Sequence, residues 1–283
     1  MPSQPHPDAT VVRFEDVSLH FGETAALDHL SFFMKAGQTC VVLGAAGSGK
    51  TQLLKTAVGL VKPDSGRVFL FDQDVTDWTE NQMFDIRARV GILFQEGGLF
   101  DSLTIAENVA YPLENQHAQM EHGKLSEQEI MDRVRESLRF VELEHTLEKF
   151  PSELSGGMRR RVGIARATVT RPELVLYDSP TAGLDPITAN TIINLIIKER
   201  DLRNTAAIMV THRFLDGHLM ANFRYNPDNG NVEAHGKGPE KDSALSTRFL
   251  VMRAGDLVFE GPEHELLASP DPYVQKFCRP GTS

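Results

Sequence analysis

The residues with the most specific chemistry form a glycine-rich turn, GAAGSGKT, at positions 44–51. The spacing G-x-x-x-x-G-K-[ST] is typical of a phosphate-binding loop, and it lies between a short apolar run at 39–43 and a helical stretch from Lys50. Small residues let backbone N–H groups converge on phosphates, and the positive end of the helix favours an anion. We expect Lys50 to reach the β and γ phosphates and Thr51 to ligate Mg²⁺. The expected nucleotide-binding residues are Gly44, Ala45, Ala46, Gly47, Ser48, Gly49, Lys50, Thr51 and Gln52.

Three polar side chains follow apolar runs that read as buried strands. Asp178 ends the run 174–178, Gln95 follows 90–94, and His212 follows the strand predicted at 205–210. Ligands bind at the carboxyl edge of open α/β sheets, and a strand-terminal carboxylate suits Mg²⁺ and its bound water. Taken alone, Gln95 is equally well explained as a solvated loop residue. The convergence of all three beside the phosphate loop favours a common site.

A second glycine-rich segment, Leu154-Ser155-Gly156-Gly157-Met158, opens a helix that continues through three arginines at 159–161. Ser155, Gly156 and Gly157 make an anion cradle of the same physical type as the first. One subunit hardly needs two such cradles. Phe21, at the end of an early strand, can stack on a nucleobase, although a buried core phenylalanine is the commoner role.

The elements around these residues alternate between strands and helices. We expect a disordered Pro-rich tail at 1–9, strands at 10–14, 17–21 and 30–34, and mostly helix from 103 to 165. A long helix is predicted at 187–202, and a hairpin at 248–259. Turn-forming residues predict an exposed insertion at about 222–247, with His218 and His235 as solvated bystanders, and a C-terminal tail at 266–283.

Composition excludes several classes of protein. The 283 residues are 41% hydrophobic and 24% charged, which is a globular balance. A net charge of −10 argues against a nucleic-acid binder, which would present a basic face. Two cysteines give no disulfide framework, and no apolar run approaches about 18 residues, so we expect a cytoplasmic protein that reaches a membrane only through another chain.

With both cradles, the Asp178 strand and His212 in this order, the sequence resembles the nucleotide-binding domain of ATP-binding cassette (ABC) transporters over residues 10–265. The resemblance implies an α/β fold: a RecA-like phosphate-loop core, an N-terminal antiparallel β subdomain and an α-helical signature subdomain at about 96–165. It also implies a head-to-tail dimer, homotypic or heterotypic, with two Mg²⁺-ATP at the interface. Each ATP would lie between the phosphate loop of one subunit and the LSGG segment of the other.

The same resemblance implies roles for single residues. Phe21 would stack on the base, Gln95 would sense the γ-phosphate and Mg²⁺, and Asp178 would ligate the metal's water. Asp185 would communicate across the dimer, and His212 would act as the γ-phosphate switch. Implied metal-site residues are thus Thr51, Gln95 and Asp178, and implied catalytic residues are Lys50, Gln95, Asp178 and His212, with position 179.

Four further segments, FQEGGLFDSLTIAENVAYPL, PSELSGGMRRR, GLDPIT and DPYVQKF, resemble the ATPase of Mla-type lipid transporters. That resemblance implies a separate integral-membrane permease, a lipid-binding substrate protein and a place on the inner face of the cell membrane. Related importers of small solutes share several of these features.

One position departs from the family pattern. The family places glutamate directly after the strand aspartate, where it accepts a proton from the attacking water; this sequence has Ser179. A serine hydroxyl is no base near neutral pH, and loss of a general base costs about 10² to 10⁴ in rate. Glu96 is a conceivable stand-in, although an exposed loop carboxylate is the simpler interpretation.

Two functions therefore stay open. The chain is either an ATP-hydrolysing subunit that drives a permease, or a degenerate, slowly hydrolysing subunit that ATP gates. A soluble ABC ATPase in translation or DNA repair is disfavoured by the single cassette and the absence of a basic surface signal.

Overall fold

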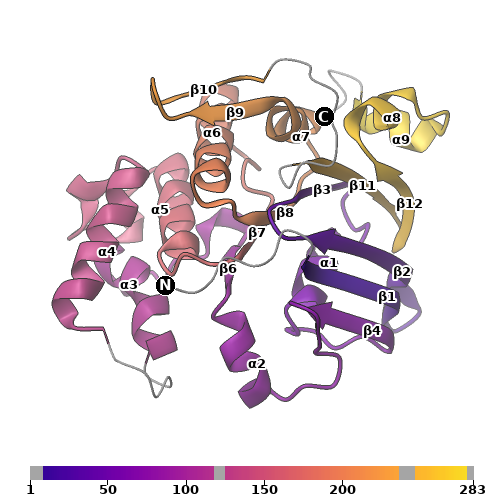
Figure 1. Ribbon diagram of the computed structural model, residues 1–283, viewed down its shortest axis with the longest axis horizontal. Helices are drawn as coiled ribbons and strands as arrows, with labels where there is room; N and C mark the ends of the chain where they lie inside the picture. The colour runs from indigo at the N-terminus through magenta and orange to yellow at the C-terminus, as the bar shows by residue number, and fades with distance from the viewer. Residues whose placement is uncertain (1–8, 118–124, 236–245, 279–283) are drawn as a thin grey trace.

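A six-stranded sheet forms the centre of the molecule (Figure 1). The structure, a computed structural model, describes residues 9–117, 125–235 and 246–278. Five neighbouring strands run parallel and the edge strand β12 is antiparallel. In spatial order the strands are β12 (Asp256–Gly261), β11 (Thr247–Arg253), β3 (Thr39–Gly44), β8 (Ala206–Val210), β7 (Leu174–Asp178) and β6 (Val90–Leu93).

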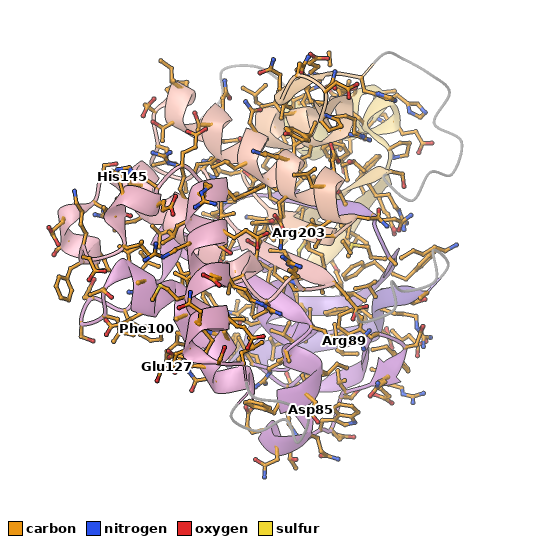
Figure 2. The ribbon with its side chains drawn as sticks, turned by 60° about the vertical axis from the view of Figure 1, so that its left-hand side comes forward. Asp85, Arg89, Phe100, Glu127, His145 and Arg203 are labelled. Carbon is orange, nitrogen blue, oxygen red and sulfur yellow. The ribbon has the colours of Figure 1, made fainter. Side chains whose placement is uncertain are left out.

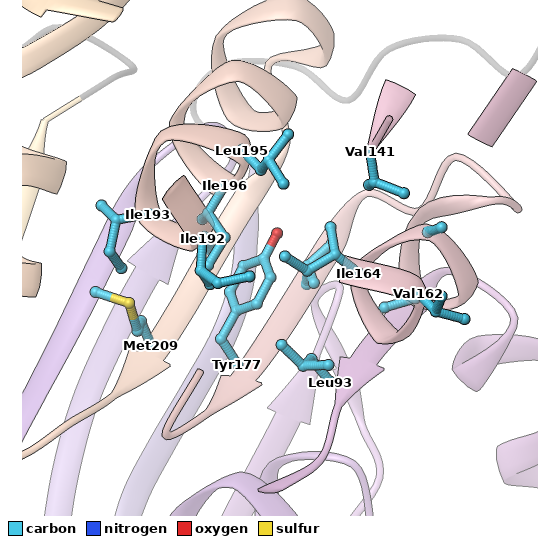
Figure 3. Packing of buried hydrophobic residues seen from close by; sticks show 14 of the residues in the cluster. Leu93, Val141, Val162, Ile164, Tyr177, Ile192, Ile193, Leu195, Ile196 and Met209 are labelled. Carbon is cyan, nitrogen blue, oxygen red and sulfur yellow. The ribbon is translucent and has the colours of Figure 1, made fainter. Parts of the chain in front are cut away.

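The central strands are apolar on both faces because both faces are covered. Val41, Tyr177 and Met209 face one core with helices α5 (Gly156–Thr168) and α6 (Pro186–Arg203). Figure 3 shows the Tyr177 ring between Ile192 of α6 and Ile164 of α5. The alternate residues of the same strands face a second core with α1 (Lys50–Ala57) and the antiparallel sheet.

The second sheet has the order β2-β1-β4-β5 and is antiparallel throughout. Its strands are β1 (Thr10–Phe21), β2 (Thr24–Lys35), β4 (Ser65–Leu70) and β5 (Gln73–Asp74). The two short runs expected at 10–14 and 17–21 are one strand, with an irregularity in register between Phe14 and Val17. The antiparallel subdomain thus agrees with the fold class read from the sequence.

Helices α3 (Ile105–His117), α4 (Glu127–Phe140) and α5 form a separate lobe on one side of the sheet (Figure 1). A capping box starts α4, in which Ser126 and Glu129 bond reciprocally. Figure 2 shows Phe100, Glu127 and His145 on this lobe. Before the C-terminal segment, the described chain also contains helices α2 (Glu80–Arg87) and α7 (Phe214–Asn222) and the 3₁₀ turns η1 (Gln95–Gly97), η2 (Glu144–Thr146) and η3 (Pro151–Glu153).

The segment expected to be an exposed insertion at 222–247 contains a β-hairpin where the turn-forming residues had predicted loops. Strands β9 (Phe223–Asn226) and β10 (Asn231–Ala234) pair and lie against α6 (Figure 1). Buried Arg200 of α6 anchors the hairpin by donating to the carbonyls of Met220 and Phe223. Residues 236–245 of the expected insertion lie outside the described part of the chain.

The C-terminal segment expected to be a tail is also ordered. Helices α8 (Glu263–Ala268) and α9 (Pro272–Cys278) pack on each other, and Val274 is fully buried. Apolar anchors every three to four residues explain this, because they give α9 a face that the core can cover. The expected disordered residues 1–8 and the last residues, 279–283, lie outside the described ranges. None of the described helices is long and apolar enough to cross a membrane.

Candidate nucleotide-binding site

The topology places four functional loops along one edge of the sheet. Because β3, β8, β7 and β6 are parallel neighbours, the loops after them emerge side by side. In that order the edge carries the phosphate loop, His212, Asp178 with Ser179, and Gln95. The structure therefore brings together the residues that were predicted to share a site.

The phosphate loop is open on one side and closely packed on the other. Gly47 has φ +77°, and a Cβ added there would meet no atom within 4 Å. Gly49 has φ +101°, and a Cβ there would lie 2.1 Å from the carbonyl oxygen of Ala26. Both positions need glycine for their backbone conformation, and Gly49 also needs it for space. The open side leaves room for an anion at the start of α1.

Lys50 lies across this loop. Its Nζ donates to the carbonyls of Gly44 and Ala45, at 2.8 and 2.7 Å, and lies 3.3 Å from the Ser48 hydroxyl. Burial lowers the pKa of Lys50, while the nearby Asp178 carboxylate acts in the opposite direction. A phosphate would replace neutral carbonyl partners with a charged one, which suits a partly desolvated ammonium.

Thr51 and Asp178 could share a divalent cation. The Thr51 hydroxyl donates to Asp178 Oδ2 at 3.1 Å. Two neighbouring ligands of octahedral Mg²⁺ lie about 2.9 Å apart, since each metal–oxygen bond is about 2.05 Å. Within the described ranges no three His, Cys, Asp or Glu residues gather at a metal-binding distance. The remaining ligands would therefore be phosphate oxygens and water, as usual for Mg²⁺ at a nucleotide.

Ser179 follows Asp178 directly in the chain. Its hydroxyl donates to Asp178 Oδ1 at 3.2 Å, and its amide donates to the carbonyl of Val210 at 2.9 Å. Its φ of +50° is uncommon for a residue other than glycine. The backbone at 179 is thus fixed by the neighbouring strand, but the side chain offers no base. The side chain of Glu96 lies outside the described part of the structure.

Three other predicted residues are exposed, two of them at this edge and Phe21 in the antiparallel sheet. His212 and Gln95 are exposed, and Phe21 at the end of β1 exposes 54% of its surface. An exposed ring of this size is available for stacking on a base. The remaining predicted residue of the loop, Gln52, is half-buried on α1, and its Oε1 is a buried atom without a hydrogen-bond partner.

The second glycine-rich cradle lies at the start of α5. Ser155 is its N-cap and accepts from the amide of Met158. Gly157 packs against the start of α6, because a Cβ there would lie 2.5 Å from Thr188 Cγ2. Asp185 caps α6 by accepting from the amides of Ile187 and Thr188. Hydrogen bonding by the Thr188 side chain, followed by these backbone bonds, lowers the pKa of Asp185. No hydrogen bond within the described ranges joins Ser155, Gly156 or Gly157 to the phosphate loop.

Sequence reasoning missed two residues beside the site. Asp216, on α7, is buried and accepts hydrogen bonds from Thr181 and Thr211. The sequence signal for Asp216 was a single carboxylate among apolar residues, four positions after His212, where a helix begins. Tyr273, on α9, has its hydroxyl 3.3 Å from the amide nitrogen of Ala45 in the phosphate loop. No local pattern could have revealed that contact.

One prediction for a histidine is wrong. His218 is not a solvated bystander, since its Nδ1 lies 2.7 Å from Glu263 Oε1 and near the side chain of Asn222. This cluster joins α7 to α8, a pairing that sequence spacing does not show. His235 is exposed, and its backbone amide donates to the carbonyl of Asn222.

Comparisons with known proteins agree with this geometry. The ABC transporter family matches residues 27–182. The probable ribonucleotide transport ATP-binding protein mkl of Mycobacterium leprae (strain TN) is 32% identical over 96% of this chain and 69% of its own length. The Arabidopsis thaliana protein named trigalactosyldiacylglycerol 3, chloroplastic, is 32% identical over 95% of this chain and 73% of its own.

Solved structures extend the likeness to the whole fold. A dimeric post-hydrolysis state of the ATP-binding cassette MJ0796, bound to ADP and Pi, superposes with a TM-score of 0.73 at 27% identity, covering 89% of this chain and 98% of that one. The cbiO1 protein of Clostridium perfringens, part of the ABC transporter complex cbiONQ, gives 0.72 at 25% identity, covering 96% of each chain. With a phosphate loop, a strand-terminal carboxylate and a second cradle in a cassette fold, this chain belongs to the ABC transporter family, as one of its ATP-binding ATPase subunits.

Proposed function

We propose that this chain is the ATPase subunit of a membrane transporter for lipids or related apolar compounds, in which ATP binding closes a dimer and Ser179 keeps turnover slow. The observation that carries the proposal is the arrangement around Asp178. Lys50, Thr51 and Asp178 form a complete set for phosphate and Mg²⁺, while Ser179 supplies only a hydroxyl that donates to Asp178. The site thus has more groups that can bind Mg²⁺-ATP than groups that can take a proton from the attacking water.

The substrate class rests on similarity. Four segments resemble the ATPase of Mla-type lipid transporters, and one relative carries the name of a galactolipid. Another relative is named for ribonucleotide transport, so the names alone favour no single substrate. The lipid proposal includes a lipid-binding substrate protein as a further partner.

A groove on the helical lobe supports the proposed permease contact. It has a volume of 330 Å³, and its lining includes Phe94, Phe100 and Tyr111, each about two-fifths exposed. Phe100 and Tyr111 pack ring against ring, with centroids 4.7 Å apart. Aromatic rings beside a groove are typical anchors of protein interfaces. Because the groove lining includes Phe94, which precedes Gln95 in the chain, a permease seated there would respond to the nucleotide site and place this chain on the inner face of the membrane.

The test is steady-state ATP hydrolysis by the purified transporter complex, comparing the natural chain with Ser179→Glu at saturating Mg²⁺-ATP. We expect the variant to turn over about a hundredfold faster or more, with ATP affinity nearly unchanged, because it restores a proton acceptor. Ser179→Gln is the matched control, since it has the length of glutamate without its basicity, and it should stay slow.

Equal turnover of the natural chain and Ser179→Glu would contradict the slow-turnover proposal. The proton of the attacking water would then leave by another route. Glu96→Ala identifies or excludes one such route, because unchanged turnover in that variant removes Glu96 as the acceptor.

A further inference from the structure

The side chain of Asp216 lies between two loops of the nucleotide site. It is 1% exposed, on the first turn of α7. Its Oδ2 accepts from the hydroxyl of Thr181 at 2.5 Å and from that of Thr211 at 2.8 Å. Thr181 belongs to the loop that follows β7, and Thr211 directly precedes His212 after β8. One oxygen atom therefore connects the two loops.

The loop after β7 needs such connections because its backbone is strained. Ser179 has φ +50°, and a residue held in this region costs about 1 to 3 kcal/mol unless the surroundings determine it. Its amide bonds to Val210, and the Arg160 guanidinium donates to the carbonyl of Ala182 at 3.0 Å. Helix α7 also helps to hold this loop, because Asp216 accepts a hydrogen bond from the hydroxyl of Thr181.

The loop after β8 is fixed from the same carboxylate. Thr211 is buried, its hydroxyl bonds Asp216, and that hydroxyl's oxygen accepts from the amide of Arg213. His212 lies between these two bonded residues, and its own side chain is exposed. A shift of Asp216 would thus move the backbone on both sides of His212.

We propose that Asp216 is a positioning residue for the ATPase reaction: its carboxylate holds the loop of Ser179 and Asp185 and the loop of His212 in one fixed relation. The inference deepens the proposed function, on which it rests, because it concerns the same site. Asp216 does not touch the nucleotide. It acts through Thr181 and Thr211, so that a change at one loop is passed to the other.

Burial makes this carboxylate a costly residue unless its bonds are kept. Burial raises the pKa of Asp216, whereas the two hydroxyl donors and Arg213, whose Nε lies 3.8 Å from Oδ1, oppose the rise. A buried carboxylate can accept several hydrogen bonds, so the origin of its donors matters more than their number. Two donors from two different functional loops point to a link between them.

The experiment removes one hydroxyl at a time, because replacing Asp216 itself could unfold the chain. Thr181→Val and Thr211→Val keep the side-chain shape and delete the donor, and Thr211→Val also removes the oxygen that accepts from the Arg213 amide. Thr181→Ser and Thr211→Ser keep the hydroxyl. Thr191→Val is the matched control, since the Thr191 hydroxyl donates to the Ile187 carbonyl on the exposed face of α6. The kcat, the KM for Mg²⁺-ATP and the melting temperature are measured in the transporter complex, for the natural chain and for the Ser179→Glu background.

We expect each valine variant to lower kcat about tenfold, the cost of one hydrogen bond to a charged group, while KM changes less than threefold. The serine variants should keep the activity. The double valine variant should be little slower than the slower single one, because both act through Asp216. Each threonine variant is compared with its own parent, either the natural chain or Ser179→Glu. The comparison can therefore be interpreted even if Ser179→Glu gives no acceleration.

Two results would overturn the inference. Suppose that Thr181→Val and Thr211→Val have the same kcat as Thr191→Val, and that all three variants lower the melting temperature equally. Asp216 would then be a purely structural carboxylate. Fully additive effects of Thr181→Val and Thr211→Val would show that the two loops are positioned independently.

Discussion

Among single residues, Phe21 exposes 54% of its surface at the end of β1, where burial of the ring would be the cheaper arrangement. If the ring stacks on the base of a bound nucleotide, Phe21→Ala should weaken ATP binding about tenfold, since stacking on a base contributes about 1 to 3 kcal/mol. Phe33→Ala is the matched control, because Phe33 on β2 is 46% exposed. Titration with ATP of both variants measures the difference, and equal affinities would exclude stacking.

Glu199 makes a prediction about pH. It is buried on α6, neither oxygen has a hydrogen-bond partner, and Arg203 Nε lies 3.2 Å from Oε1. Burial raises its pKa from 4.5 to about 7. Below pH 4.5 the carboxyl is protonated in both folded and unfolded chains. As pH rises to about 7, only the unfolded chain ionises, so this residue progressively loses its contribution to stability.

The increase in the free energy of unfolding caused by Glu199→Gln should therefore be larger at pH 8 than at pH 4.5, by up to about 3 kcal/mol. Glu144→Gln is a control of opposite sign, because Arg139 lowers the pKa of the half-buried Glu144. Denaturant unfolding at the two pH values measures the effect. An identical change in the free energy of unfolding at both values would mean that the pKa of Glu199 is the same in the folded and unfolded chains.

Among the elements, helix α9 reaches the phosphate loop. The Tyr273 hydroxyl donates to the carbonyl of Met252 at 2.9 Å and accepts from the amide of Ala45 at 3.3 Å. Tyr273→Phe should raise the ATP dissociation constant about threefold to tenfold, because one neutral hydrogen bond steadies the loop. Tyr225→Phe, on β9, is the control. Isothermal titration gives both values, and equal affinity would show that α9 merely packs beside the loop.

Elements whose signal is local could be predicted from the sequence. The buried strands before Gly44, Gln95 and Asp178 are continuous apolar runs, and the parallel order then places their loops at one edge. What depends on distant partners could not. Tyr273 contacts a residue 228 positions away, and the hairpin at 223–234 owes its place to Arg200 of α6. Asp216 likewise can bond to both loops only because β7 and β8 are neighbours in the sheet.

For the whole molecule, we expect the second cradle to belong to a site shared by two chains. Ser155 and Gly156 are exposed at the start of α5, without a bond to the phosphate loop of their own chain in the described ranges. MJ0796, with the same fold, is dimeric in a state bound to ADP and Pi. An anion cradle that faces solvent is best explained by the nucleotide of a partner subunit.

Gly156→Asp tests this arrangement without harm to the fold. A Cβ at Gly156 has Leu184 Cδ2 as its nearest neighbour, at 3.8 Å, and a carboxylate in the first turn of a helix favours that helix. The melting temperature should stay constant or rise, whereas ATP-dependent dimerisation should be lost because like charges meet. Gly157→Ala, whose Cβ would lie 2.5 Å from Thr188, should instead lower the melting temperature.

Mixing two defective chains shows which chain completes which site. Lys50→Ala removes the phosphate-binding ammonium, and Gly156→Asp blocks the second cradle. In a head-to-tail dimer with one chain of each kind, one nucleotide site carries both defects and the other carries neither. Because one of the two sites is intact, about half of the ATP-dependent dimerisation should return. If both motifs served a nucleotide on the same chain, neither chain would have an intact site. The mixture would then bind no better than its two components, and the shared site would be excluded.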